Sequence, residues 1–255
     1  MEDDQYIKAY TLFRAALQQV PPSGEIVIYD WPTLPRKIPG HWMVYFEMLS
    51  DYSRELANII NQFVTYIDML TAWDKVLLDY GEEDRFYLVH EFVEPICTIS
   101  LNLPYVVRSR FIFFVTHLCH QANISLLGKK WKDDLAEDQK INFKSMDKVA
   151  TNWPPYKQLK LSMGQLADKR HQAEVNHYRH KFHHRYPPRI EFGLSEMIKR
   201  NINEAGRVSY GIGYSLPLRI GQITSSLKGQ HAAAIGVYKC YRELVDEQLK
   251  TIMSA

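Results

Sequence analysis

The sequence has few cysteines, and no motif pairs them. Cys97, Cys119 and Cys240 are odd in number and lie far apart, with no Cys-x-x-Cys pair among the 255 residues. This pattern excludes a disulfide framework and a four-sulfur zinc site. A reducing compartment is therefore the default expectation.

An excess of charge of one sign is also missing. The chain has 31 Lys and Arg against 29 Asp and Glu, which leaves a formal net charge of +2 at pH 7. Net charge therefore indicates no particular class of partner. With 46% hydrophobic and 24% charged residues, the composition is that of a folded globular protein and excludes a disordered tail or a collagen-like repeat.

No hydrophobic run is long enough to cross a membrane. The strongest run, residues 111–115, is flanked by Arg108 and Arg110 and is far shorter than the ~18 residues that a membrane helix needs. The acidic stretch 1–5 is not followed by the apolar core of a signal peptide. These observations predict a soluble, cytoplasmic protein without membrane contact.

Motifs of several common enzyme classes are absent. Gly211 and Gly213 lack the G-x-G-x-x-G spacing, and no signature context of an activated Ser or Cys nucleophile occurs. His117 and His120 have a spacing that can bind zinc, but the sequence nominates no two further ligands. We expect a locally hydrogen-bonded pair, with no metal and no cofactor. A metal-dependent hydrolase that combines this pair with later histidines is a further alternative.

Apolar residues recur at three- and four-residue intervals over most of the chain, which predicts a mainly α protein. The expected helices cover residues 2–20, 41–80, 82–127, 155–186 and 217–252. The 41–80 stretch forms one long helix or two, and Pro95 and Pro104 are expected to interrupt the next. Residues 129–152 form a loop or a short helix.

Two short β elements complete the expected fold. Strict alternation predicts a strand over 208–214, with 189–192 as its partner, and 25–29 is a candidate short strand. The prediction is one domain over 1–255, a bundle of about four long helices. An N-terminal helix and strand extension covers about 1–40, and a small β-hairpin insertion covers about 189–215, before the last helix.

Half of the ten histidines lie in one stretch of unusual composition. They are His171, His177, His180, His183 and His184, interspersed with Arg170, Arg179 and Arg185. The ordinary interpretation is a solvated basic helix face. On an ideal helix, however, Val175, Tyr178 and Phe182 face the core, and the other two faces each present imidazole beside guanidinium.

This combination suits phosphate chemistry. A guanidinium has fixed donors that match phosphate oxygens, and a neutral imidazole can accept a proton near neutral pH. Together they can cleave RNA without metal, since the base activates a ribose 2′-hydroxyl and the guanidinium stabilises the charge on the phosphorane. The helix end before Pro187 favours imidazolium, which suits a general acid.

At these residues the sequence resembles the HEPN superfamily of helical, nucleotide-associated domains, many of which are ribonucleases. The family motif is an Arg, a polar residue that is most often Asn, and a His separated from the Arg by four to six residues. Arg179 and His184 fit with four intervening residues, His180 takes the polar place, and Arg185 follows as in many relatives.

The resemblance implies roles for these residues. Arg179 would bind the scissile phosphate, His184 would be general base or acid, His180 would orient the phosphate or Arg179, and His183 would be in reserve. Arg179 and His184 lie about 140° apart around an ideal helix, so they converge only if the last turn distorts or a second chain contributes. A second register, Arg170 and His171 with His177, fits the motif with six intervening residues.

The resemblance also implies a HEPN-like helical domain that forms a homodimer, in which the two motifs face each other as one metal-independent endoribonuclease site. RNA is then the substrate, and a toxin or phage-defence setting with a cognate antitoxin follows by the same resemblance. Some HEPN-like domains lack nuclease activity. The alternative is therefore a non-catalytic dimeric module that binds a nucleotide or a protein.

Overall fold

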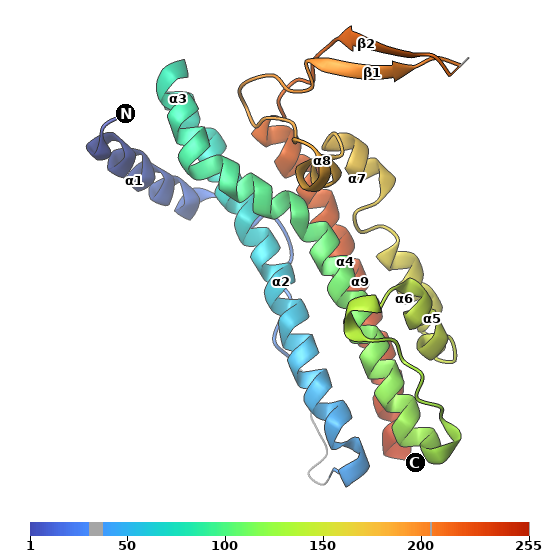
Figure 1. Ribbon diagram of the computed structural model, residues 1–255. Helices are drawn as coiled ribbons and strands as arrows, with labels where there is room; N and C mark the ends of the chain where they lie inside the picture. The colour runs from blue at the N-terminus through green and yellow to red at the C-terminus, as the bar shows by residue number, and fades with distance from the viewer. Residues whose placement is uncertain (31–37, 205, 255) are drawn as a thin grey trace. The chain divides into compact units, whose positions relative to one another are not determined.

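The computed structural model describes residues 1–30, 38–204 and 206–254, and it is mainly helical (Figure 1). Residues 31–37 of the expected N-terminal extension lie outside the described residues. Three helices have 34 or 35 residues: α2 (Met43–Val76), α4 (Glu94–Leu127) and α9 (Ile220–Ser254). The shorter α1 (Asp3–Gln19) precedes them. The mainly α fold is confirmed, but the estimate of about four long helices is not exact.

The chain divides into two compact units. Unit 1 comprises Met1–Ser23, Val64–Leu103 and Asp168–Gly229, and unit 2 comprises Gly24–Phe63, Pro104–Ala167 and Gln230–Ala255. Each of α2, α4 and α9 contributes one part to each unit. The organisation as a single domain stays a prediction.

Unit 1 has an aromatic core. The ring of Trp73 in α2 lies between two parallel rings, with centroid distances of 4.5 Å to Phe13 and 5.0 Å to Phe92. Such stacks add to the free energy of burial that large rings provide. They fix α1 against α2 and against the helical turn that precedes α4.

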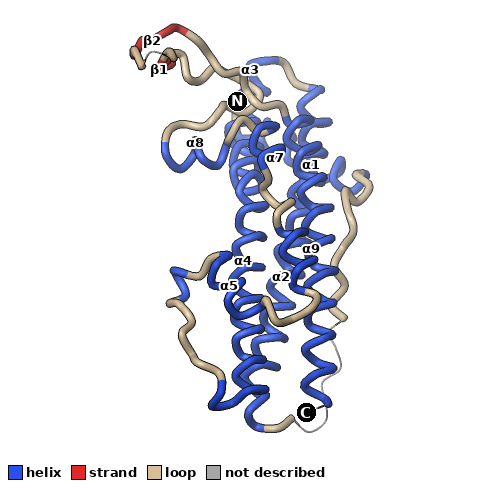
Figure 2. The backbone as a smooth tube through the Cα atoms, turned by 90° about the vertical axis from the view of Figure 1, so that its right-hand side faces the viewer, coloured by secondary structure: helices blue, strands red, loops and turns tan. Residues whose placement is uncertain are grey.

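In unit 2 the parts of α2, α4 and α9 lie side by side in both views (Figures 1 and 2). Their buried polar groups are paired across helices. The Tyr45 hydroxyl donates to Gln248 Oε1 at 2.8 Å, and the hydroxyls of Ser53 and Tyr241 lie 3.0 Å apart. Pairing of this kind removes the cost of burying polar atoms in the helical core.

The prolines do not interrupt the helix that contains them, contrary to the prediction. α3 (Glu82–Leu88) continues through a π-helical turn, Val89–Val93, directly into α4. In this turn the Glu94 N–H donates to Val89, five residues earlier, and the wider turn accommodates Pro95. Pro104 lies inside α4, where fully buried neighbours such as Leu101 and Val107 offset the ~3 kcal/mol cost of an internal proline.

The prediction of one helix over 155–186 is wrong, because residues at positive φ divide this segment. It contains α6 (Tyr156–Met163), α7 (Lys169–Glu174) and α8 (Tyr178–His184), and α5 (Phe143–Ala150) precedes them. The φ angles are 50° at Ala167, 50° at Asn176 and 54° at His177. Left-handed residues cannot continue a right-handed helix, whatever the apolar spacing around them.

The β predictions are correct in part. A hairpin precedes α9 as expected, but β2 (Val208–Ile212) pairs antiparallel with β1 (Ile198–Ile202) and not with 189–192. Ile190 instead forms a single parallel bridge with Leu218. No strand forms at 25–29, because the side chain of Asn61 pairs with both backbone groups of Val27, at 2.8 and 2.9 Å, where a neighbouring strand would otherwise bond.

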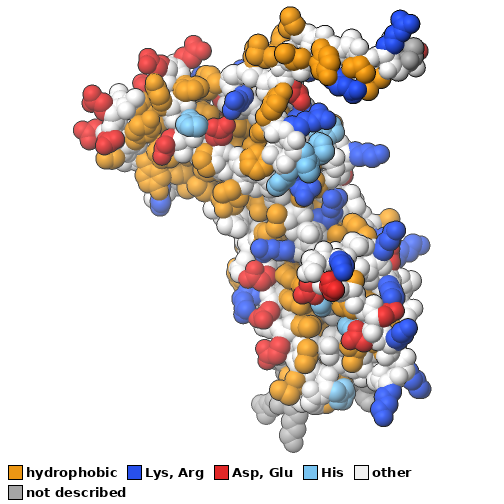
Figure 3. Space-filling view, viewed as in Figure 1, with side chains coloured by type: hydrophobic (Ala, Val, Ile, Leu, Met, Phe, Trp, Pro, Cys, Tyr) orange, Lys and Arg blue, Asp and Glu red, His pale blue; other side chains and the backbone are white. Residues whose placement is uncertain are grey.

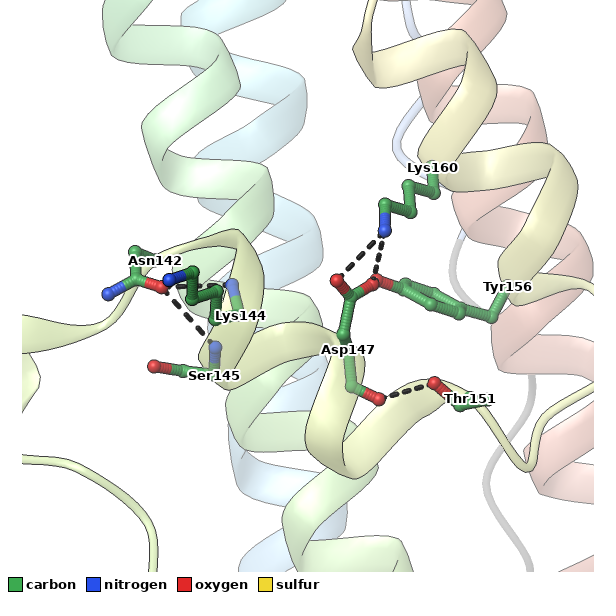
Figure 4. Close-up of polar contacts among 7 residues, drawn as sticks. All are labelled: Asn142, Lys144, Ser145, Asp147, Thr151, Tyr156 and Lys160. Carbon is green, nitrogen blue, oxygen red and sulfur yellow. Dashed lines mark hydrogen bonds and ion pairs between the residues drawn. The ribbon is translucent and has the colours of Figure 1, made fainter.

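A polar network joins α5 to α6 in unit 2 (Figure 4). Asn142 caps α5 by accepting from the Lys144 N–H at 2.9 Å. Asp147 accepts from the Tyr156 hydroxyl and from Lys160 Nζ at 2.6 and 2.8 Å. Burial opposes ionisation of Asp147, but the bonds from Lys160 and Tyr156 outweigh it and lower the pKa of this carboxyl.

We predict that Asp147→Asn lowers the free energy of unfolding by about 0.5–1 kcal/mol at pH 7, a discounted figure because the Asp147 side chain is 37% exposed. Since the pKa of Asp147 is lower in the folded chain, its contribution is present above the unfolded pKa and is lost as pH falls through the folded one. Urea unfolding at pH 7 and pH 3 measures this, and a cycle with Lys160→Met isolates the pair. An equal difference at both pH values would contradict it.

Candidate functional site

The candidate site lies on α8. The buried side chain of Tyr178 anchors this helix to the rest of unit 1. The Tyr178 hydroxyl lies 2.9 Å from Thr98 Oγ1 of α4, and Tyr178 is 2% exposed. Val175, just before α8, is buried as predicted. Phe182 was predicted to face the core too, but it is 43% exposed and stacks on Tyr178 with a centroid distance of 5.9 Å. One side of α8 is thus anchored and the rest faces solvent.

The exposed part of α8 carries the first predicted register. Arg179, His180, His183 and His184 are all exposed. The rings of His180 and His184, one helical turn apart, have their centroids at 5.0 Å, and those of His183 and His184 lie at 6.5 Å. In Figure 3 histidine side chains gather beside those of Lys and Arg. We call Arg179, His180, His183 and His184 the α8 cluster.

The α8 cluster does not bring Arg179 and His184 onto one face. α8 is a regular helix up to Arg185, whose N–H still donates to Lys181 at 2.8 Å, so its last turn is not distorted. Residues five apart therefore remain about 140° apart around the helix. The pair that the structure does bring together is His180 with His184, which the motif alone did not single out.

Lys181 of α8 does not belong to the α8 cluster, because its side chain is engaged with the loops on either side of the helix. Its Nζ donates to Asn176 at 2.8 Å and to Glu196 at 2.9 Å, and Glu196 also accepts from Ser215. These bonds hold the pKa of Glu196 below its ordinary value, the Ser215 hydroxyl having the largest effect. The network ties α8 to the base of the hairpin, and sequence spacing had given no sign of it.

The second register is separated by the break between α7 and α8. Arg170 pairs with Glu174 at 2.8 Å on the surface, His171 is 1% exposed, and His177 lies outside both helices at positive φ. The line that these residues would form on one continuous helix therefore does not exist.

His171 takes part in a structural network within unit 1. Its Nδ1 lies 2.9 Å from Ser226 Oγ, and the Ser226 hydroxyl donates to Glu174 at 2.7 Å. Because a serine hydroxyl has one proton, His171 Nδ1 must be the donor to Ser226. The imidazole therefore cannot take the Ser226 proton through this contact, and the arrangement does not activate a nucleophile. Burial lowers the pKa of His171, against the opposing effect of Asp168 and Glu174.

The other histidine pair lies in unit 2, and each of its members faces a different carboxylate. His117 Nε2 is 3.3 Å from Asp138, and His120 Nε2 is 3.3 Å from Asp133. The Trp131 indole N–H donates to His120 Nδ1 at 3.3 Å. Over 1–30, 38–204 and 206–254, no three or more His, Cys, Asp or Glu side chains are grouped to hold a metal ion. The predicted local hydrogen bond is confirmed for His120, which accepts from Trp131, whereas His117 Nε2 lies near Asp138 without a hydrogen-bond partner among the described residues.

One cavity follows α8 directly in unit 1. It has a volume of about 410 Å³ and is lined by residues that include Tyr186, Arg189, Ser195 and Glu196. The Ser195 hydroxyl is buried and has no hydrogen-bond partner among the described residues. Tyr186 is 58% exposed, so more than half of this residue is accessible to solvent.

Among the described residues, one helix has the length and composition that a membrane span requires, although the sequence analysis predicted no stretch of that kind. It covers Glu82–Lys130, and 50% of its most apolar window is buried inside the protein. A core helix of a folded protein meets the same criterion, so this observation is weak evidence for a membrane.

No protein family, curated protein or solved structure matches this chain. The resemblance to the HEPN superfamily therefore rests on the residues of the motif and stays a prediction.

We predict that His171→Gln reduces the loss of stability between pH 7.5 and pH 5. The pKa of His171 is lower in the folded chain than in the unfolded chain, so its contribution is complete above the unfolded pKa and is lost as pH falls towards the folded one. Urea unfolding over this range measures the slope. His184→Gln is the matched exposed control, and equal slopes for wild type and His171→Gln would contradict the prediction.

Proposed function

We propose that the α8 cluster binds RNA phosphate and cleaves the neighbouring phosphodiester without a metal ion. The observation that carries the proposal is the exposed pair of imidazoles, His180 and His184, with ring centroids 5.0 Å apart, on the helix that also bears Arg179. Two imidazoles on one face can divide the acid and base roles that the reaction requires.

The chemistry needs only groups of this chain. A neutral imidazole, from His184 or His180, takes the proton of a ribose 2′-hydroxyl, and the 2′-oxygen attacks the adjacent phosphorus. The bond from phosphorus to the 5′-oxygen breaks, and the other residue, as imidazolium, gives that oxygen its proton. The products are a 2′,3′-cyclic phosphate and a 5′-hydroxyl. The Arg179 guanidinium stabilises the additional negative charge on the phosphorane.

A homodimer would overcome the angular separation of Arg179 and His184 around α8. Because they lie about 140° apart around α8, one phosphate cannot lie between both within one chain. A second copy that faces the α8 cluster would supply its own Arg179 to the imidazole pair. The exposure of all four side chains of the cluster leaves room for such an approach.

The neighbouring cavity supports RNA as the ligand. Tyr186 lies two residues after His184 and lines the cavity of about 410 Å³. Exposed aromatic rings stack on unpaired bases, and Arg189 in the same cavity can contact a phosphate or a base. A base in this cavity would place its backbone near the end of α8.

A second candidate function is binding of RNA, or of another phosphorylated ligand, without cleavage. The exposure of the cluster favours it, because His180 and His184 are open to solvent and do not line the cavity that follows α8. Exclusion of water strengthens the electrostatic effects on which catalysis depends.

We predict that the purified protein cleaves a labelled, unstructured RNA in the presence of EDTA and leaves a 2′,3′-cyclic phosphate. Arg179→Ala, His180→Ala and His184→Ala should each lower the rate by about 100-fold or more, because each removes a group that acts in the transition state. Gel analysis of the cleavage products measures the rates. Arg14→Ala and His41→Ala, at exposed positions elsewhere, are the matched controls.

Three outcomes would contradict this prediction. Cleavage that survives all three substitutions would remove the α8 cluster as the site. Loss of cleavage in Arg170→Ala and His177→Ala instead would identify the second register. Salt-sensitive binding of RNA that stays intact would establish the binding function in place of cleavage.

A further inference from the structure

The hairpin in unit 1 has one apolar face and one polar face. Cross-strand partners are Ile198 with Ile212, Arg200 with Tyr210, and Ile202 with Val208. Because side chains alternate along a strand, these six lie on one face. The other face carries Lys199, Asn201, Ser209 and Gly211. We call the first the hairpin face.

The hairpin face is open to solvent. The exposed fraction of its apolar side chains runs from 48% at Val208 through 70% at Tyr210 to 97% at Ile212. A sheet with a face this apolar normally packs it against another layer, and a lone two-stranded hairpin is only marginally stable. Within the residues that the structure describes, no other layer covers this face.

We propose that the hairpin face packs against the hairpin face of a second copy of this chain. At the observed exposures, its five apolar and aromatic side chains offer on the order of 600 Å² per chain, near the lower end of what a specific interface buries on each partner. An interface of this size lies at the weak end of specific association, so we expect a dimer that dissociates readily. This interface is a different contact from the one through which a second copy would face the α8 cluster, and it does not depend on any activity of that cluster.

The arrangement of the six residues selects one orientation. A two-fold axis parallel to the strands lays β1 of one copy over β2 of the other. Arg200 then faces Tyr210 of the second copy, a favourable cation–π contact, and the aliphatic pairs face each other. An in-plane axis perpendicular to the strands would instead oppose the two Arg200 side chains, and like charges repel.

Other occupants fit the hairpin face less well. Insertion into a lipid bilayer would require an apolar turn at the tip of the hairpin. The segment that joins β1 to β2 instead contains the polar or charged residues Asn203, Glu204 and Arg207. RNA would require a row of cations, whereas this face has one Arg among aliphatic side chains and a Tyr. A second copy satisfies both the apolar pairs and the single Arg.

The test is the dissociation constant of the dimer, measured by sedimentation equilibrium on the full chain. Tyr210→Asp should weaken the dimer by 100-fold or more, because it buries a carboxylate in the interface. Ser209→Asp is the matched control on the adjacent residue, whose side chain points to the other face, and it should change the constant less than twofold. Circular dichroism verifies that both variants keep their helices.

Arg200→Ala tests the orientation. It should weaken the dimer about 5-fold if Arg200 faces Tyr210, and it should tighten the dimer if the two arginines face each other. A wild-type chain that stays monomeric at 100 µM would overturn the proposal, and so would equal effects of Ser209→Asp and Tyr210→Asp. Binding of RNA or lipid vesicles by a monomer, abolished by Tyr210→Asp, would reveal a different occupant.

Discussion

Two consecutive residues at positive φ, Asn176 and His177, determine what the histidine-rich segment becomes. The left-handed conformation costs roughly 1–2 kcal/mol for a residue with a side chain. Here it is stabilised by the His177 N–H, which donates to Gln172 at 2.7 Å, and by the burial of Val175 and Tyr178 on either side. Without this break, α7 and α8 would be one helix.

The break sorts the histidines by environment. On its N-terminal side, His171 is buried, donates to Ser226 and has a lowered pKa. On its C-terminal side, His180 and His184 are exposed and lie one helical turn apart. The same residue type therefore stabilises the fold at one position and is available to a ligand at the other.

The sequence predicts the elements whose stability is local and periodic. The apolar stripes of α1, α2 and α9 give these helices to within a few residues. The predicted breaks at Pro95 and Pro104 are wrong, since burial along α4 outweighs a local preference. The single helix over 155–186 is wrong because hydrophobic spacing does not report backbone handedness. Asp168, which caps α7, was an available signal of that division.

The candidate site was predictable to a similar degree. Composition and motif spacing lead to the α8 cluster, because its members are close together in sequence. Helix geometry already separates Arg179 from His184 by about 140°, and the regular last turn of α8 keeps that angle. The motif spacing alone does not reveal that the rings of His180 and His184 lie together. The contact of His171 with Ser226 joins residues that are distant in sequence. The contact of His120 with Asp133 involves a segment without apolar periodicity. Both contacts exist only once the helices pack.

The sorting of the histidines is the central claim, and imidazole NMR tests it most directly. Protein labelled with ¹⁵N in its histidines would be titrated with a non-cleavable RNA dinucleotide whose ribose carries a 2′-methoxy group. The account predicts shifts of the ring signals of His180 and His184 and none of those of His171. Shifts at His171, or none at the α8 cluster up to millimolar dinucleotide, would contradict it.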